Sequence, residues 1–535
     1  MPGDQAGGPP PRASELSYHS APGRWTLLAT VLGSGMALID ATVVGIALPA
    51  IGRQFHSGVL ELQWVSNAYT LALAGLLLLG GALGDRFGRR RLFQIGTAWF
   101  ALASLACGAA PDGPALVAAR AVQGVGAALL MPGSLAILQA SFSPADRSRA
   151  IGAWSGLSGV ATAVGPVLGG WFISAVSWRL IFFINLPIAV AVLIVSSRHV
   201  PESRSAGPGT RLDVPGAILV SLGLAGLTYG LTEGAALGWA SVATLAAVVG
   251  GLALLVVFCL VERASAAPLL PLGVFGSLQF SGANGVTFVV YGGLGGAFFL
   301  LPIQLEQVLG FSPLAAGLAL LPVTVIMLVL SARSGALAAR IGPRLQMSVG
   351  PLLVGAGLAM FVRVSAGGGY VTAVLPAVVV FGLGLAVTVA PLTTTVLAAA
   401  PSEHAGIASA INNDVARAAG LIAVAVLPSL AGIGGHSYLH PAVFSSGFHR
   451  AVLIAAGACA VGALVGRPGS CRGSQPGGPR GHCAGAAGLF STSGCGAAQR
   501  VRKSALVGAH VHPLRFDAPR RCHFATSVPT EPGVA

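Results

Sequence analysis

Charged residues are scarce in this chain of 535 residues, of which only 9% are Asp, Glu, Lys or Arg. A soluble globular domain carries about 25% charged residues, so this composition excludes an ordinary soluble protein. Hydrophobic residues make up 54% of the chain, and the mean hydropathy is +0.81. This composition is typical of a protein that crosses a membrane many times.

Several chemical motifs are also missing. The P-loop pattern G-x-x-x-x-G-K-[ST] does not occur, so nothing supports direct ATP hydrolysis. The seven cysteines follow neither a disulfide framework nor a zinc-ligand spacing, and the apolar runs contain no Cys-His cluster. Nothing resembles an activated nucleophile or a cleavable signal peptide. We therefore expect no enzymatic activity, no cofactor and no metal site.

Apolar runs of about 20 residues, the length that crosses a bilayer, are abundant instead. Fourteen such spans are predicted, at residues 25–49, 62–84, 92–110, 115–139, 150–174, 178–197, 214–234, 239–261, 281–304, 313–336, 346–363, 371–398, 405–432 and 448–466. The flanking segments, residues 1–24 and 467–535, are rich in Pro, Gly or Ser, and we expect them to be disordered. The basic tail from residue 467 shows no apolar periodicity and is compatible with a non-native segment.

Arginine placement predicts the orientation of these spans. If the N-terminus is cytoplasmic, the loops that follow even-numbered spans are cytoplasmic as well, and these loops carry most of the loop arginines. Both termini are then predicted to lie on the cytoplasmic side of the cell membrane. The net charge of +14 reflects these loops and the tail, and it does not indicate a nucleic-acid surface.

A charged turn separates the second and third predicted spans. Four arginines lie between residues 86 and 91, so the turn belongs at the membrane surface, and its glycines allow a tight turn and close helix packing. The string resembles the loop motif G-x-L-a-D-R-x-G-R-[RK] of the major facilitator superfamily of secondary transporters. The matching residues are Gly81, Leu83, Asp85, Arg86, Gly88, Arg89 and Arg90. The resemblance implies a cytoplasmic gating loop.

A weaker copy of this motif follows at residues 335–344, in which Ala339 replaces the aspartate. Two six-helix halves related as parallel repeats are a transporter architecture. We therefore predict an all-α integral membrane fold with an N-terminal six-helix half at 25–197 and a C-terminal six-helix half at 276–466. The linker at 198–275 would hold two extra central helices. If a gating loop needs the aspartate to hold the halves together, only the loop of the N-terminal half, which contains Asp85, should do so.

Two charges lie inside predicted spans, where an ionised side chain is costly unless it is paired or hydrated. Asp40 lies about 13 Å below the outer end of its span and Arg120 about 8 Å below the outer end of its own. The two side chains are therefore close enough in depth to pair, directly or through water. For each residue a static role, as a fixed bond between helices, is the alternative to a functional one.

The strings around these charges resemble transporter motifs. The string from Leu38 to Pro49 resembles the L-D-x-T-x-x-N-x-A-L-P signature of the fourteen-span drug:proton antiporters of the EmrB/QacA type, with Gly45 in place of the usual Asn. The string around Arg120 resembles the fourth-helix motif l-x-x-x-R-x-x-q-G-x-g-a-a. The resemblance implies that Asp40 carries the proton and that Arg120 is its exchange partner.

Two further strings resemble those of the same subfamily. Gly165, Pro166, Gly169 and Gly170 match the G-P-x-x-G-G motif of exporters, although a generic small-residue interface would explain them too. The string from Trp178 to Pro187 resembles W-R-x-I-F-x-I-N-x-P, and we interpret it mainly as an interfacial anchor.

Polar residues in the C-terminal half gather in one predicted span and resemble the family pattern N-N-x-x-R-x-x-G. Asp414 and Arg417 are three residues apart and could neutralise each other. A static pair and a cavity lining both remain open. The possible substrate-cavity residues are Gln123, Asn412, Asn413, Asp414 and Arg417.

The resemblance implies a proton-coupled efflux transporter for drugs or antibiotics. Its partners would be a small amphipathic substrate, protons and the lipid bilayer, and we expect a monomer. One alternative is an exporter dedicated to a single metabolite. Another is a transport-inactive membrane sensor or scaffold. Gly45 and Ala339, which depart from the family motifs, and the basic tail are compatible with this alternative.

Overall fold

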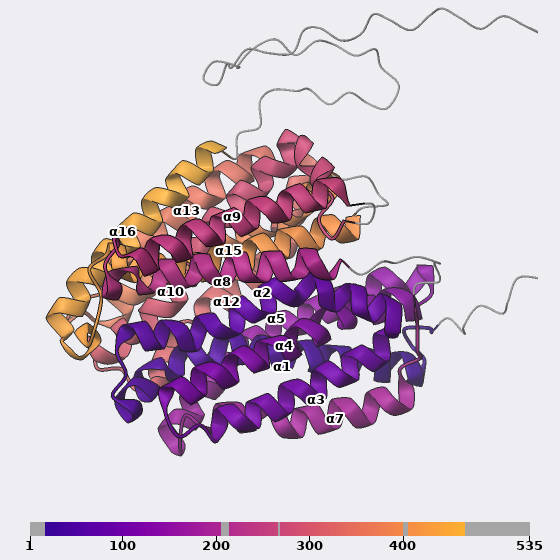
Figure 1. Cartoon of the computed structure of the whole chain (residues 1–535), viewed down its shortest axis with the longest axis horizontal. Helices are drawn as coiled ribbons and strands as arrows, with labels where there is room; N and C mark the ends of the chain where they lie inside the picture. Colours follow the sequence, from indigo (N-terminus) through magenta and orange to yellow (C-terminus); the bar gives the residue numbers. More distant parts are fainter. Residues whose placement is uncertain (1–15, 205–212, 266–267, 400–404, 466–535) are drawn as a thin grey trace, which may run out of the picture. The chain divides into compact units, whose positions relative to one another are not determined.

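The structure is a computed structural model that describes residues 16–204, 213–265, 268–399 and 405–465. The predicted disordered tail at 467–535 lies outside the described residues. The fold is all-α, as predicted, and Figure 1 shows its helices in chain order. The described α-helices are α1 Ala21–Phe55, α2 Val59–Phe87, α3 Arg89–Gly108, α4 Gly113–Ser141, α5 Pro144–Ala175, α6 Leu180–Phe183, α7 Asn185–His199, α8 Val214–Leu237, α9 Val242–Ala264, α10 Leu278–Gln307, α11 Pro313–Ala319, α12 Leu321–Ile341, α13 Arg344–Met360, α14 Leu375–Ala398, α15 Ala405–Leu430 and α16 Pro441–Val465.

Helix starts follow ordinary capping chemistry. Asp112 accepts a hydrogen bond from the backbone of Ala115 at 2.8 Å, and Asp213 accepts one from Gly216 at 2.8 Å. Each cap satisfies a backbone donor that has no partner inside its helix. Proline is the second residue after the cap at both starts, in the first helical turn, where its missing N–H costs nothing.

Thirteen helical segments in the described ranges are long and apolar enough to cross a membrane. Each coincides with a predicted span, and two of them contain a short break, between α6 and α7 and between α11 and α12. The remaining predicted span corresponds to α3, a 20-residue helix with three arginines in its first turn that packs against α4. The chain is a multi-pass membrane protein.

The segment before α1 differs from the prediction. The backbone N–H of Leu16 donates to the Ser141 carbonyl at 2.8 Å, and that of Tyr18 donates to the Asp146 carboxylate at 2.9 Å. The expectation of disorder for residues 1–24 therefore does not hold for residues 16–24. Hydrogen bonds to the end of α4 and the start of α5, more than a hundred residues away in sequence, hold this segment, and its composition did not reveal them.

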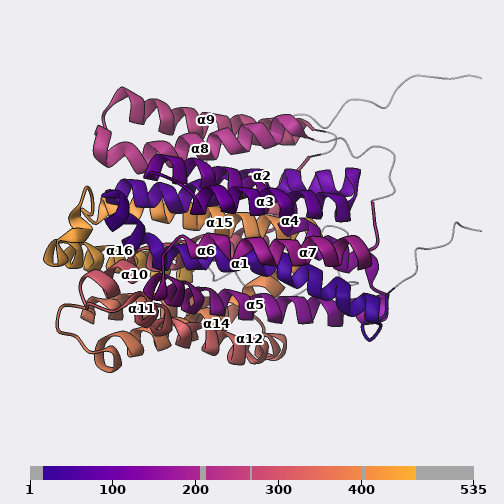
Figure 2. The ribbon, with the colours of Figure 1, turned by 90° about the horizontal axis from the view of Figure 1, so that it is seen from below.

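Helices α1–α7 pack together as one half of the bundle and α10–α16 as the other. The hairpin of α8 and α9 packs through α8 on α2 of the first half and on α15 of the second. Figure 2 shows α8 and α9 lying along α2. We call the end of the bundle where α2 meets α3 the arginine-turn end, and the end where α1 meets α2 the opposite end.

The two halves hold each other near the opposite end. Gln63 on α2 donates to the Val424 carbonyl at 2.6 Å, and the Tyr438 hydroxyl donates to the Ser57 carbonyl at 2.8 Å. Toward the arginine-turn end, a Cβ added at Gly152 or Gly156 of α5 would meet open space within 4 Å. The halves therefore contact each other near the opposite end, while the face of α5 that carries Gly152 and Gly156 has open space beside it at the arginine-turn end.

Candidate functional site

Asp40 lies in the interior of the N-terminal half, with no solvent-exposed surface. One carboxylate oxygen accepts a hydrogen bond from Arg120 Nη1. The other accepts from Gln123 Nε2 at 2.8 Å and from Asn185 Nδ2 at 3.2 Å. Three donors thus stabilise a charge that apolar surroundings alone would strongly disfavour.

Arg120 is equally buried and has partners besides Asp40. Its Nη1 also donates to Gln123 Oε1 at 2.6 Å, and its Nε donates to the Val65 carbonyl at 3.2 Å. The guanidinium carbon lies 4.3 Å from the centre of the Tyr69 ring, which adds a cation–π contact. Arg120 is therefore held by groups that do not depend on the charge of Asp40.

A second layer of side chains fixes the amides that contact Asp40. Ser104 Oγ on α3 accepts hydrogen bonds from Gln123 at 2.8 Å and from Asn185 at 3.2 Å. The sequence placed Asp40 and Arg120 at similar depth, and the structure brings them into direct contact. The contribution of Asn185 and Ser104 was missed, although Asn185 was a polar residue inside a recognised apolar motif.

The charged turn between α2 and α3 forms where it was predicted. Asp85 pairs with Arg89, whose Nε lies 2.8 Å from the carboxylate. Gly88 has a φ of +116°, a backbone conformation that glycine adopts without strain. Gly342 occupies the matching position between α12 and α13 with a φ of +83°, so the internal repeat also appears in the backbone.

Glu202 completes this turn and was missed in the sequence. Its carboxylate accepts hydrogen bonds from the backbone N–H groups of Arg90 at 3.1 Å and Arg91 at 3.2 Å. It thereby caps the start of α3 from the segment that follows α7. A Cβ at Gly88 would collide with this carboxylate. The turn is thus tied to the end of the sixth predicted span.

The close approach of α2 to α4 depends on Gly80 and not on Gly81. A Cβ at Gly80 would collide with the Ala128 carbonyl, whereas one at Gly81 would make only an ordinary contact 3.6 Å from Pro132. Arg86, the first arginine of the charged turn, makes a cation–π contact with its neighbour Phe87. The guanidinium carbon lies 5.4 Å from the centre of the Phe87 ring.

The Gly-Pro motif of α5 lies at two helix contacts. A Cβ at Gly165 would collide with Thr42 of α1, and one at Gly169 would collide with Val43. A Cβ at Gly170 would collide with the Pro313 carbonyl of α11, in the other half. The motif therefore lets α5 approach both α1 and the C-terminal half. Pro166 takes part through its carbonyl, which lies against Gly317 of α11.

The polar residues of α15 do not form one cluster. Asn412 donates to Asn284 at 3.1 Å and to Thr287 at 2.6 Å on α10, while Asn413 is exposed and donates to its own helix. Arg417 points to the sulfur of Met131 on α4, 3.4 Å away. Successive helical residues point about 100° apart, so neighbours in sequence face different helices.

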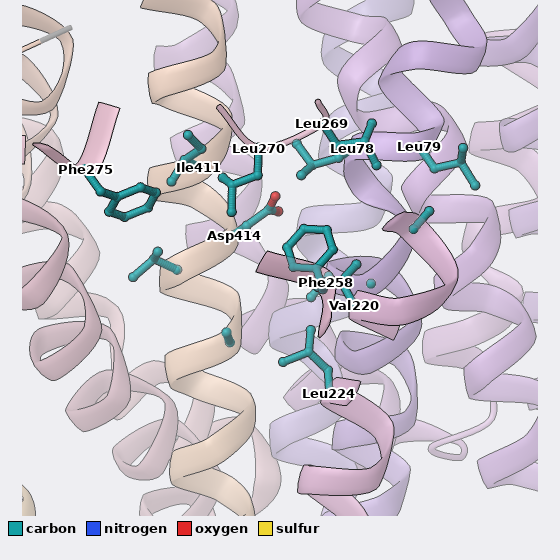
Figure 3. Close-up of a pocket in the computed structure, with 15 residues that line it drawn as sticks. Leu78, Leu79, Val220, Leu224, Phe258, Leu269, Leu270, Phe275, Ile411 and Asp414 are labelled. Atoms are coloured by element: carbon teal, nitrogen blue, oxygen red, sulfur yellow. The ribbon is translucent and has the colours of Figure 1, made fainter. Parts of the chain in front are cut away.

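Two further members of the predicted cavity group have the following surroundings. The ion pairs of the described residues do not include one between Asp414 and Arg417. Gln123, a possible substrate-cavity residue, lies in the buried network around Asp40. Asp414 does line a pocket, which is drawn in Figure 3, and its Oδ1 atom is buried without a hydrogen-bond partner.

A multi-pass helical bundle with a buried acid–arginine pair in one half is typical of a membrane transporter. The sequence profile of the Major Facilitator Superfamily matches residues 30–425. The chain belongs to this family, which confirms the resemblance noted in its motifs.

Several characterised relatives are similar over most of their length. The chain is 36% identical over 404 residues to the tetracenomycin C resistance and export protein of Streptomyces glaucescens, which covers 75% of this chain and 74% of that protein. It is 38% identical over 430 residues to the puromycin resistance protein pur8 of Streptomyces alboniger, covering 78% and 84%. The multidrug resistance protein Stp of Mycobacterium tuberculosis is 35% identical over 410 residues, covering 76% and 75%.

Solved structures share the fold. An inward-facing, unoccupied bacterial homolog of the human lysosomal transporter Spinster superposes with a TM-score of 0.59 at 18% identity. The match covers 84% of this chain and 97% of that chain. A peptide transporter in complex with sulfate superposes with a TM-score of 0.59 at 15% identity, over 82% and 92% of the two chains.

Proposed function

We propose that this protein exports small amphipathic molecules, such as drugs or antibiotics, from the cytoplasm in exchange for protons. The relatives named for resistance and export support efflux. The arginine-rich turn supports a cytoplasmic position for the arginine-turn end. In this proposal the monomer has fourteen spans, arranged as six, two and six, with both termini cytoplasmic.

The buried contact between Asp40 and Arg120 is the observation that carries the coupling proposal. When Asp40 is ionised, Arg120, Gln123 and Asn185 neutralise or solvate it. When a proton binds Asp40, Arg120 keeps Val65, Gln123 and Tyr69 as partners. The pair can therefore open without leaving a buried charge unsupported, which is what a reversible proton carrier requires.

The packing of the two halves supplies the second part of the mechanism. The halves contact each other near the opposite end, and one face of α5 has open space beside it at the arginine-turn end, so we assign this arrangement to the state that receives substrate from the cytoplasm. Export then requires the halves to rock about their shared contacts. The small residues Gly165, Gly169 and Gly170 let α5 slide against α1 and α11 without a steric clash.

Inside-out vesicles with an acidic lumen test this proposal. A drug added outside should release lumenal protons in the wild type, because the drug enters as protons leave. Asp40→Asn should lose this release. Asp112→Asn is the matched control, because Asp112 only caps α4 and should retain exchange. Release that persists in Asp40→Asn at wild-type rates would exclude Asp40 as the carrier.

A dedicated exporter of one metabolite is the second candidate. It is favoured by relatives named for single compounds, such as the cephamycin export protein CmcT of Amycolatopsis lactamdurans, which is 34% identical over 403 residues, covering 75% of this chain and 83% of that protein. Substrate breadth separates the two functions: a multidrug exporter should release protons with several unrelated compounds, and a dedicated exporter with one chemical class only.

A further inference from the structure

The last turn of α10 contains an acid that the proposed mechanism does not use. Glu306 lies one residue before the end of α10, at the opposite end of the bundle, and its side chain is only 3% exposed. The preceding residues Ile303, Gln304 and Leu305 have no exposed surface. An ionised carboxylate is costly in such surroundings unless donors or a counter-ion support it.

The support for an ionised Glu306 is weak. Its Oε2 atom lies 3.7 Å from Arg53 Nη2, which is too far for a hydrogen bond. Its Oε1 atom is buried and has no hydrogen-bond partner among the described residues. Asp40, in contrast, is saturated, because three protein donors contact its two oxygens. A single cation at this distance offsets only part of the cost of burying the Glu306 charge.

Arg53, near the end of α1, is the charged group that faces Glu306 from the N-terminal half. The other ionisable residues of α1, Arg24 and Asp40, lie about 20 Å or more along the helix from Arg53. His56, the residue after α1, makes no hydrogen bond or ion pair with Glu306. The Arg53 side chain is 48% exposed and therefore reaches the medium at this end.

The described part of the C-terminal half adds no second counter-ion. The helices α11 and α14 contain no titratable residue, and α13 contains only Arg344, at the arginine-turn end. Arg363, in the turn after α13, makes no ion pair with Glu306. The other titratable residues of α10 and of the elements packed against it face other sites: Tyr291 on α10, Asp414 and Arg417 on α15, Tyr438 before α16, and His449 and Arg450 on α16.

The contact between Arg53 and Glu306 joins the two halves. Helix α1 belongs to the N-terminal half and α10 to the C-terminal half, and the two helices pack against each other. One residue before Arg53, a Cβ at Gly52 would collide with the Tyr438 hydroxyl of the C-terminal half. Rocking that separates the halves at this end therefore exposes Glu306 to the medium, and rocking back buries it again.

We propose that Glu306 is a second proton-binding site, and that a proton bound there from the medium at the opposite end helps the halves to close at that end. In the open arrangement water solvates the carboxylate, and closure replaces this water with apolar surroundings and one partial ion pair. A proton converts the carboxylate to a neutral carboxylic acid and removes this cost. Arg53 remains hydrated through its exposed surface, so losing the ion pair strands no charge.

This site differs from the coupling pair in role as well as in position. The proton binds Glu306 from the medium at the opposite end and returns to the same medium when the halves reopen, so it is not carried across the membrane. The proposal rests on the efflux function and describes its regulation. An acidic exterior favours return of the exporter to the state that receives substrate from the cytoplasm.

Double electron–electron resonance between two spin labels tests the proposal on the full-length chain in lipid nanodiscs. The labels replace Val176, after α5, and Val443, on α16, which are 73% and 54% exposed at the opposite end of different halves. The exposed Cys259 and the four cysteines beyond residue 465 are replaced by serine, while the buried Cys107 and Cys459 remain. The measurement needs neither a drug nor a proton gradient.

Raising the pH from about 6 to about 8 should increase the ratio of the long to the short label distance, by at most about tenfold per pH unit for one linked proton. Glu306→Gln should stay closed at alkaline pH and respond less, because it carries no charge. Glu61→Gln is the matched control, since Glu61 lies at the same end but contacts Gly113 within the N-terminal half, and it should respond as the wild type does. A wild type that does not respond, or a Glu306→Gln variant that responds equally, would overturn the proposal.

Arg53→Gln removes the one counter-ion of Glu306. At alkaline pH it should raise the ratio of the long to the short distance about threefold or more, and at acidic pH it should match the wild type, because a neutral acid needs no counter-ion. The double variant with Glu306→Gln should behave as Glu306→Gln alone. An Arg53→Gln variant that equals the wild type at alkaline pH would also overturn the proposal.

The same variants, assayed for export, separate this site from the efflux function. Loss of export by a chain whose closure still depends on Glu306 would reject the efflux function alone. Intact export by a chain whose closure does not depend on Glu306 would reject this proton site alone.

Discussion

Two acids in the membrane-spanning helices of this protein, one buried and one half-buried, have different surroundings. Asp40, in the N-terminal half, accepts hydrogen bonds from Arg120, Gln123 and Asn185 and has no exposed surface. Asp414, in the C-terminal half, has a buried oxygen with no donor and faces an apolar pocket. The comparison shows that donors from α4 and α7 support the charge of Asp40, whereas one Asp414 oxygen has no such donor.

Removing the cation from the saturated site should produce the largest effect. Arg120→Ala leaves Asp40 without its counter-ion in the protein interior, and breaking a buried pair costs about 3–5 kcal/mol. We expect a large fall in the unfolding temperature of the detergent-solubilised protein, together with loss of export. A double variant, Asp40→Asn with Arg120→Gln, should recover stability but not export. A single variant as stable as the wild type would show that the pair is not a coupled unit.

Removing one amide donor should leave the Asp40 carboxylate with fewer hydrogen bonds and so reduce its difference from the Asp414 carboxylate. Asn185→Ala deletes a hydrogen bond to a carboxylate and one to Ser104, and we expect a loss of about 1–3 kcal/mol of stability. Asn413→Ala is the matched control, because that exposed amide donates only within its own helix. Equal stability losses in the two variants, measured by thermal unfolding, would mean that the network around Asp40 contributes nothing specific.

Neutralising the unpartnered acid should have the smallest effect on stability. Asp414→Asn removes no hydrogen bond or ion pair among the described residues, so its unfolding temperature should equal or exceed that of the wild type. The unfolding temperatures of Asp414→Asn and Asp40→Asn, measured side by side, test this expectation. Destabilisation of Asp414→Asn to the level of Asp40→Asn would show that Asp414 has a structural partner.

Much of the fold follows from the sequence because apolar runs and breaks are local signals. The apolar runs predicted every described spanning helix, and the Gly88 turn and its repeat at Gly342 were visible as short motifs. The pairing of Asp40 with Arg120 was also predictable, since each is an isolated charge at a similar depth in an apolar run. Family motifs then indicated the class of transporter.

Other features depend on contacts between distant segments. Glu202 caps α3 from more than a hundred residues away, and nothing in its own surroundings marks that role. Gly80 rather than Gly81 faces α4, because small rotations of α2 decide which glycine meets the neighbouring helix. The different partners of Asn412, which contacts α10, and Arg417, which contacts α4, likewise depend on the position of every packed helix. Sequence spacing alone suggested a single polar cluster.

The most direct test compares drug-driven proton release from inside-out vesicles for Asp40→Asn and Asp112→Asn, each with a cationic and a neutral substrate. We predict that Asp40→Asn loses release with both substrates, because coupling itself fails. Asp112→Asn should retain release with both substrates, because Asp112 only caps α4. Proton release by Asp40→Asn that equals the wild type, with either substrate, would contradict the assignment of the saturated acid as the proton carrier.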